Sequence, residues 1–152
     1  MKMSRTCYMC EYVQDVEFTD ISDAISLAEI IGEAYGRDNI DILFDKNWDN
    51  DIKKAVAGKG NNDFSIKLYI KPNTCPNGIY IKGSGYSSVE VYVKYRGEST
   101  YSLISITAFS SEPSLSFLDG QEISEILLKM PHDGGDGTEI WQEIAIVKIP
   151  KV

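Results

Sequence analysis

Alternation between apolar and polar residues in the middle of the chain restricts its fold more than any other feature of the sequence. From residue 64 to residue 71, and again from residue 89 to residue 96, every second residue is apolar. A period of two sends successive side chains to opposite faces of a β-strand. Both segments are therefore predicted to be strands with one face buried.

The sequence around these two strands predicts further strands. Residues 71–78, KPNTCPNG, combine prolines with an Asn-Gly pair and are typical of a turn. A return strand begins at residue 79, and another strand covers residues 100–109. Residues 140–149 are apolar on both sides near their centre, which predicts a closing strand inside the sheet. The short connections between successive strands predict an antiparallel meander.

Helical spacing of apolar residues predicts helices on both sides of the strand region. Residues 20–35 carry apolar residues at helical intervals and are followed by Gly36, a residue suited to ending a helix. Residues 48–58 predict a short second helix. A third helix is expected over residues 119–130, because a carboxylate pair with capping-box spacing precedes its apolar face and a proline follows it.

Together these elements predict a single α+β domain over residues 1–152. Strand candidates at residues 12–18 and 40–44 bring the mainly antiparallel sheet to about five to six strands, with two to three helices. The length suffices for one domain with its own core. No segment reaches the ~20 apolar residues of a membrane span, and the N-terminus lacks an apolar stretch of signal-peptide length. We therefore expect a soluble cytoplasmic protein without a membrane partner.

Cysteine usage indicates reduced thiols. The chain has three cysteines, Cys7, Cys10 and Cys75, an odd number that does not fit a disulfide framework. Cys7 and Cys10 form a C-x-x-C pair, but a zinc site would need Cys75 and the single histidine, His132, to join them from distant segments. We expect no metal and no cofactor, and keep this zinc site as the alternative.

No motif in the sequence predicts catalysis. DKNWDND at residues 45–51 has the first ligand spacing of an EF-hand loop, but it lacks the glycine at position six and the glutamate at position twelve. We interpret it as a turn that caps a helix, or as a recognition patch around Trp48. HDGGDG at residues 132–137 is interpreted as a solvated loop. Phosphate-loop, nucleophile-elbow and zinc-protease motifs do not occur, so no catalytic residue is predicted and the chain is not expected to be an enzyme.

Charge is divided into three blocks along the chain. Residues 1–63 carry 13 carboxylates and 7 basic residues, residues 64–97 carry 1 and 5, and residues 98–152 carry 9 and 3. The blocks sum as −6, +4 and −6, which gives the net charge of −8. Such an arrangement favours contact with a macromolecule by charge complementarity.

The central basic block suggests one candidate surface. If the strands are registered as predicted, cations and aromatic rings share one polar face, a pattern typical of single-strand nucleic-acid platforms. The residues of this face are Lys67, Tyr69, Lys71, Tyr80, Lys82, Tyr92, Lys94 and Arg96. A solvated sheet surface is the simpler interpretation, since cross-strand packing alone favours tyrosine.

The late glycine-rich stretch from His132 to Gly137, followed by Ile140 and Trp141, is similar to a segment of bacterial immunity proteins. These belong to polymorphic-toxin and contact-dependent growth-inhibition systems. A small, acidic α+β chain without a catalytic set also resembles them. The resemblance implies a cytoplasmic inhibitor that binds and neutralises a cognate protein toxin.

A toxin directed at nucleic acid would have a basic nuclease-type cleft that carboxylates can fill. This hypothesis assigns partner binding to three acidic patches: a predicted helix face, the aspartate-rich turn and the late loop. The residues are Glu29, Glu33, Asp45, Trp48, Asp49, Asp51, Asp133 and Asp136. Single-stranded nucleic-acid binding by the Lys/Tyr face is the alternative function.

Overall fold

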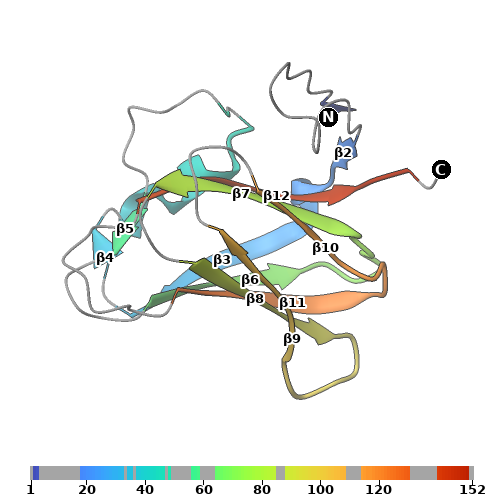
Figure 1. Cartoon of the computed structure of the whole chain (residues 1–152). Coiled ribbons are helices and arrows are strands. Elements are labelled where there is room, and N and C mark those ends of the chain that lie inside the picture. The colour runs from blue at the N-terminus through green and yellow to red at the C-terminus, as the bar shows by residue number, and fades with distance from the viewer. Residues whose placement is uncertain are drawn as a thin grey trace.

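Two antiparallel β-sheets face each other in the computed structural model (Figure 1). The structure describes residues 2–3, 18–32, 34–35, 37–46, 48, 56–58, 64–84, 88–108, 114–130 and 140–150. Every strand pairing within these ranges is antiparallel. The result is a jelly-roll-like β-sandwich.

The first sheet is built around its last strand. Its path runs β1 (Lys2–Met3), β2 (Phe18–Asp20), β12 (Ile140–Lys148), β5 (Val56–Gly58) and β4 (Ala34–Tyr35). β7 (Gly78–Ser84) pairs with β12 along nearly its whole length, and β10 (Ser114–Phe117) pairs with the other edge of β7. β12 therefore has neighbours on both edges, as its apolar sequence predicts.

The second sheet has five strands. In spatial order they are β3 (Ile25–Ile31), β6 (Phe64–Ile70), β11 (Ile123–Met130), β8 (Ser88–Tyr95) and β9 (Ser102–Ala108). Two 3₁₀-helices, η1 (Ser22–Ala24) and η2 (Arg37–Phe44), connect the early strands. Within the described ranges no helix is long and apolar enough to cross a membrane.

The core fills the space between the two sheets. Alternate residues of β6, β7, β8, β11 and β12 point inward, and Trp141 is the largest fully buried side chain among the described residues. The inward aliphatic residues include Ile66, Leu68, Ile79, Ile81, Val91, Ile126, Leu128, Ile144 and Ile146. Removing this apolar surface from water is the main force that holds the sheets together.

A second, smaller cluster covers the outer face of β7 and β12. Phe18 packs on Tyr80 with ring centroids 4.6 Å apart, and Trp48 meets Tyr80 edge-on at 6.1 Å. Ala145 and Val147 complete the buried set. Phe18 on β2 and Trp48 in the segment that follows η2 (the η2 connection) thus cover the outer side of this sheet.

A buried carboxyl group lies beside this cluster. Glu143 is only 1% exposed, and its Oε2 accepts a 2.8 Å hydrogen bond from the backbone N–H of Lys46. Its register partner Lys82 is also buried and donates Nζ to the carbonyl oxygen of Trp48. Burial, together with the neighbouring Asp45 carboxylate, raises the pKa of Glu143 to about 10. Glu143 is therefore protonated at neutral pH and joins the η2 connection to β12.

The α+β prediction is wrong, because the described chain contains no α-helix. The expected helix at residues 20–35 is η1 followed by β3. A β-bulge between Ile25 and Leu27 adds one residue to the strand, so the core-facing residues Ile25 and Ala28 are three apart. That interval imitates the spacing of a helix face.

The expected helix at residues 119–130 fails for the same reason. Residues 123–130 form β11, and a bulge between Ile123 and Glu125 places the buried Ile123 and Ile126 three residues apart. Residues 40–44, expected as a strand, belong to η2. Of the helix expected at residues 48–58, residues 56–58 are strand β5, and most of the remainder lies outside the described residues.

The strands predicted over residues 64–71, 89–96 and 140–149 correspond to β6, β8 and β12, but the predicted meander is wrong. β6 and β8 belong to the second sheet and are separated by β11, whereas β7, which lies between them in sequence, belongs to the first sheet. Of the strand candidate at residues 12–18, only Phe18 falls within the described residues, at the start of β2.

Because Glu143 is protonated in the folded chain, we expect the free energy of unfolding to depend on pH. Its folded pKa of about 10 exceeds its ordinary value of 4.5, so between these two values the folded chain keeps a proton that the unfolded chain has lost. The contribution of this proton to the free energy of unfolding is fully present below pH 4.5. It decreases by up to about 1.4 kcal/mol per pH unit as the pH rises toward the folded pKa. We expect Glu143→Gln, which has no proton to lose, to gain stability relative to the natural chain as the pH rises.

Thermal unfolding of both proteins from about pH 5 to about pH 9 measures this difference. A melting-temperature difference between Glu143→Gln and the natural chain that stays constant across the range would show that Glu143 is ionised in the folded state.

Candidate ligand-binding groove

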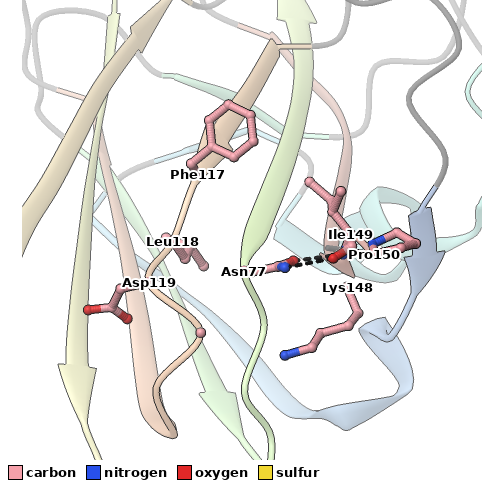
Figure 2. Close-up of a pocket in the computed structure, with 8 residues that line it drawn as sticks. Asn77, Phe117, Leu118, Asp119, Lys148, Ile149 and Pro150 are labelled. Atoms are coloured by element: carbon pink, nitrogen blue, oxygen red, sulfur yellow. Dashed lines mark hydrogen bonds between the residues drawn. The ribbon is translucent and has the colours of Figure 1, made fainter. Parts of the chain in front are cut away.

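A groove opens at one end of the first sheet, where three separate segments meet. It has a volume of about 370 Å³ and is lined by Asn77, Phe117, Leu118, Asp119, Gly120, Lys148, Ile149 and Pro150 (Figure 2). Strand pairing explains the meeting, because Gly78 at the start of β7 is registered with Phe117 on β10 and with Val147 on β12. The end of β10 and the end of β12 therefore form opposite walls.

Asn77 joins the two walls at the base of the groove. Its Nδ2 donates to the carbonyl oxygen of Ile149 at 2.8 Å, and its Oδ1 accepts from the N–H of Ile149 at 2.7 Å. Its backbone carbonyl accepts from the N–H of Leu118 at 2.8 Å, and its own N–H donates to Val147 at 3.2 Å. These four bonds hold the walls at a constant separation, so the groove is formed before any ligand arrives.

Phe117 gives the groove an exposed aromatic ring. The side chain is 70% exposed, although its neighbour Ser116 is buried. Ser116 points toward β9, where its hydroxyl accepts from Ser105 Oγ at 3.3 Å, and Phe117 is consequently directed away from the core. The ring lies on the same wall as Leu118 and Asp119 (Figure 2). Apolar rings that remain exposed beside a concave surface are typical of ligand contacts.

Charged groups stand on both walls. Asp119 accepts hydrogen bonds from the Tyr95 hydroxyl at 2.6 Å and from the N–H of Gln121 at 3.2 Å. Burial and the Asp119 carboxylate raise the pKa of Tyr95 to about 12, so this hydroxyl remains a donor that orients Asp119. On the opposite wall, Lys148 Nζ donates to the carbonyl oxygen of Cys75 at 2.8 Å. An ammonium group has three donors and a carboxylate about four acceptor positions, so both groups keep capacity for a ligand.

A second hollow also has Lys148 in its lining. Its volume is about 390 Å³, and it is lined by Ile21, Ala24, Asn73, Thr74, Cys75 and Lys148. Lys148 therefore lines both hollows. Among the described residues, no group of three or more histidine, cysteine or carboxylate side chains is arranged to hold a metal ion.

Three of the residues predicted for partner binding are described by the structure, and none of the three lines the groove. Glu29 lies exposed on β3 in the second sheet, whereas Asp45 and Trp48 lie in the connection that covers the outer side of the first sheet. Trp48 is half-buried against Tyr80. The remaining predicted residues, Glu33, Asp49, Asp51, Asp133 and Asp136, lie outside the described residues, as do Cys7, Cys10 and His132.

The predicted Lys/Tyr face is assembled only in part. Lys67, Tyr69, Tyr92 and Lys94 share the outer face of the second sheet. Tyr80 and Lys82 belong to β7 in the other sheet and are buried, while Lys71 and Arg96 follow the ends of β6 and β8. The two lysines of the face are paired with Glu125, at 3.1 Å from Lys94 and 3.8 Å from Lys67.

The sequence matches no protein-family model and no curated protein significantly. Comparison of structures does give matches. The F5/8 type C domain of a Bacteroides fragilis protein superposes with a TM-score of 0.63 at 12% identity, over 88% of this chain and 98% of that domain. The fold is that of F5/8 type C domains.

Two longer proteins contain the same architecture. The CBM32 domains of Clostridium perfringens ZmpB, solved in complex with GalNAc, match with a TM-score of 0.64 at 14% identity, over 86% of this chain and 35% of that one. A GH29 fucosidase from Ruminococcus gnavus, solved in complex with fucose, matches with a TM-score of 0.65 at 13% identity, over 88% and 27%. The present chain thus spans about a third or less of these two proteins.

These matches correct the functional predictions. The resemblance to immunity proteins is wrong, because the structures that share this fold are F5/8 type C and CBM32 domains. Neutralisation of a protein toxin and binding of single-stranded nucleic acid are contradicted with it, since CBM32 domains match and have been solved in complex with GalNAc. The groove residues Asn77, Phe117, Asp119 and Lys148 were not predicted as site residues.

Gly78 lies in close contact with side chains of β10 and of the end of β12. A Cβ added at this residue would meet Leu115 Cδ1 and Val147 Cγ2 at 3.0 Å and Ile149 Cδ1 at 3.2 Å. Overpacking costs about 1–3 kcal/mol, which exceeds the ~0.4–1 kcal/mol that alanine gains by restricting the unfolded chain. We expect Gly78→Ala to lose about 1 kcal/mol and to melt roughly 3 °C lower. A melting temperature equal to or above that of the natural chain would show that the walls can move apart.

Proposed function

We propose that this chain is a non-catalytic carbohydrate-binding module that holds a sugar in the groove beside Phe117. The observation that carries the proposal is the 70% exposed Phe117 ring at a groove with a carboxylate on one wall and an ammonium group on the other. A sugar ring has a face of C–H bonds and a rim of hydroxyl groups. The aromatic ring suits the C–H face, and Asp119 and Lys148 suit the rim as acceptor and donor.

The size and rigidity of the groove agree with this function. Its volume of about 370 Å³ falls within the range of small-molecule sites. The Asn77 bonds hold both walls in place, so little conformational entropy is lost when a ligand binds. The fold supports the same ligand class, because CBM32 domains with this architecture have been solved in complex with GalNAc.

Binding without catalysis is proposed from the composition of the lining. The eight lining residues include one carboxylate, Asp119, which is already engaged by Tyr95 and Gln121. Glycoside hydrolysis ordinarily uses a pair of carboxyl groups on opposite sides of the bond that breaks. The described groove therefore supplies groups for recognition and lacks the second carboxyl group for cleavage.

Removal of the aromatic ring tests the proposal directly. We expect screening on a glycan array to find a ligand, and Phe117→Ala to weaken its binding roughly tenfold, equivalent to about 1.4 kcal/mol. Isothermal titration calorimetry with the free sugar measures the change. Leu103→Ala is the matched control, because Leu103 is also an exposed apolar residue but lies on β9 outside the groove. Equal affinities of Phe117→Ala and the natural chain would contradict this site.

The role of Asp119 as an acceptor is tested by Asp119→Asn. Asparagine keeps the shape and can still accept from Tyr95, but hydrogen bonds to a charged group contribute about 1 kcal/mol more than hydrogen bonds to a neutral one. We expect a roughly fivefold loss of affinity for a neutral sugar in the same titration. An unchanged affinity would remove Asp119 from the contact while leaving the Phe117 test standing.

A further inference from the structure

Exposed apolar side chains lie on both edge strands of the five-stranded sheet, on its outer face. Among the described residues, five large hydrophobic side chains are exposed, and four of them are on this face: Leu27 at 55%, Ile31 at 43%, Leu103 at 50% and Ile106 at 61%. Leu27 and Ile31 are on β3 and the other two are on β9, the two edge strands of the sheet. In Figure 1 this sheet is the lower layer, and its outer face points away from β7 and β12.

The centre of the face is a fixed network of tyrosines and charges. Glu125 accepts from the hydroxyl of Tyr101 and forms ion pairs with Lys94 and Lys67. Lys94 Nζ lies 4.8 Å from the centroid of the Tyr101 ring, and Lys67 Nζ lies 5.6 Å from that of Tyr69. Burial and Glu125 raise the pKa of Tyr101 above its ordinary value, so its hydroxyl remains a donor. The rings are consequently held in place.

The charges of this face cancel each other. The outer positions of the sheet carry three lysines and three glutamates, so their sum is zero, whereas the whole chain carries −8. These residues are Lys67, Lys94, Lys129, Glu29, Glu90 and Glu125. Register places Lys129 beside Glu90, and Lys67 beside Glu29. Two copies of a chain with this net charge repel each other, and a neutral face is where they approach at the lowest electrostatic cost.

We infer that the outer face of the five-stranded sheet is the contact surface of a symmetric pair of this chain. A two-fold axis would bring the same face of each copy together, with apolar edge strands meeting apolar edge strands around the tyrosine network. A strongly charged partner would require a face of opposite net charge, and the net charge of this face is zero. The exposed apolar pairs on the two edge strands would leave water when the two copies meet, which favours association.

The area of the face suits a weak, reversible pair. Five strands about 4.8 Å apart, each with about seven residues that rise about 3.3 Å, cover roughly 24 by 23 Å. Two copies would then bury about 1,100 Å² in total, just above the ~1,000 Å² expected of a biological interface. The pair is independent of sugar binding, but it would carry two Phe117 grooves and so raise the avidity for a multivalent glycan.

Sedimentation velocity over a concentration series tests the pair. We expect the natural chain to shift from monomer to dimer as its concentration rises. Ile106→Glu on β9 and Leu27→Glu on β3, both at exposed residues, should each weaken the dimer at least about tenfold, because each substitution is repeated across the two-fold axis. Phe117→Glu is the matched control, since it adds the same charge at an exposed apolar residue outside this face.

Dimerisation that is lost in both variants on the face and retained in Phe117→Glu supports the inference. A natural chain that sediments as a monomer throughout would overturn it, and so would a dimer equally stable in all the variants. Sugar affinity that is lower in Tyr92→Ala than in the natural chain, with both titrated at concentrations where they are monomers, would also overturn it and assign the face to a glycan. Phe117→Ala tests sugar binding in the groove alone. A chain that does not dimerise can therefore still bind a sugar, and the two proposals can fail independently.

Discussion

The pairing of β12 with β7 is the interaction on which the rest of the structure depends. Inward side chains of the two strands, with Trp141 among them, form one wall of the core. Two of their outward side chains, Glu143 and Lys82, bind the backbone of Lys46 and Trp48 in the segment that follows η2. At the far end of the same ladder, Gly78 aligns β10 and β12 as the walls of the groove. A shift of this register by one residue would exchange the two faces and remove all three features.

Sequence alone predicts strands best where their alternation is regular. β6, β8 and β12 are recognisable because apolar residues recur at every second position or fill a continuous run. β3 and β11 are misread as helices because each contains a bulge, which lengthens one interval between inward residues to three. Local spacing cannot distinguish this from a helix face; only the partner strands, distant in sequence, determine which structure forms.

The groove could not be predicted from residue types. Leu115 and Phe117 alternate with Ser114 and Ser116, a pattern that would place Phe117 in the core. The structure does the opposite, because Ser116 points inward to Ser105 and leaves Phe117 in solvent. Part of the Lys/Tyr face was predicted, since residues in one alternating strand share a face. The sequence did not indicate that Glu125, read as part of a helix, neutralises two of its lysines.

The two hydrogen bonds between the Asn77 side chain and the Ile149 backbone also affect the chemical ageing of the protein. Asn-Gly is the dipeptide at which asparagine loses ammonia most readily, because glycine hardly hinders attack of its backbone nitrogen on the side-chain amide. In the folded chain both ends of that amide are engaged by the backbone of Ile149, which holds the amide in one orientation and opposes the rotation that attack requires. A deamidated copy would turn a carboxylate oxygen toward a carbonyl oxygen. The base of the groove would lose this donor, so the fold protects the site from the ageing to which its Asn-Gly sequence is prone.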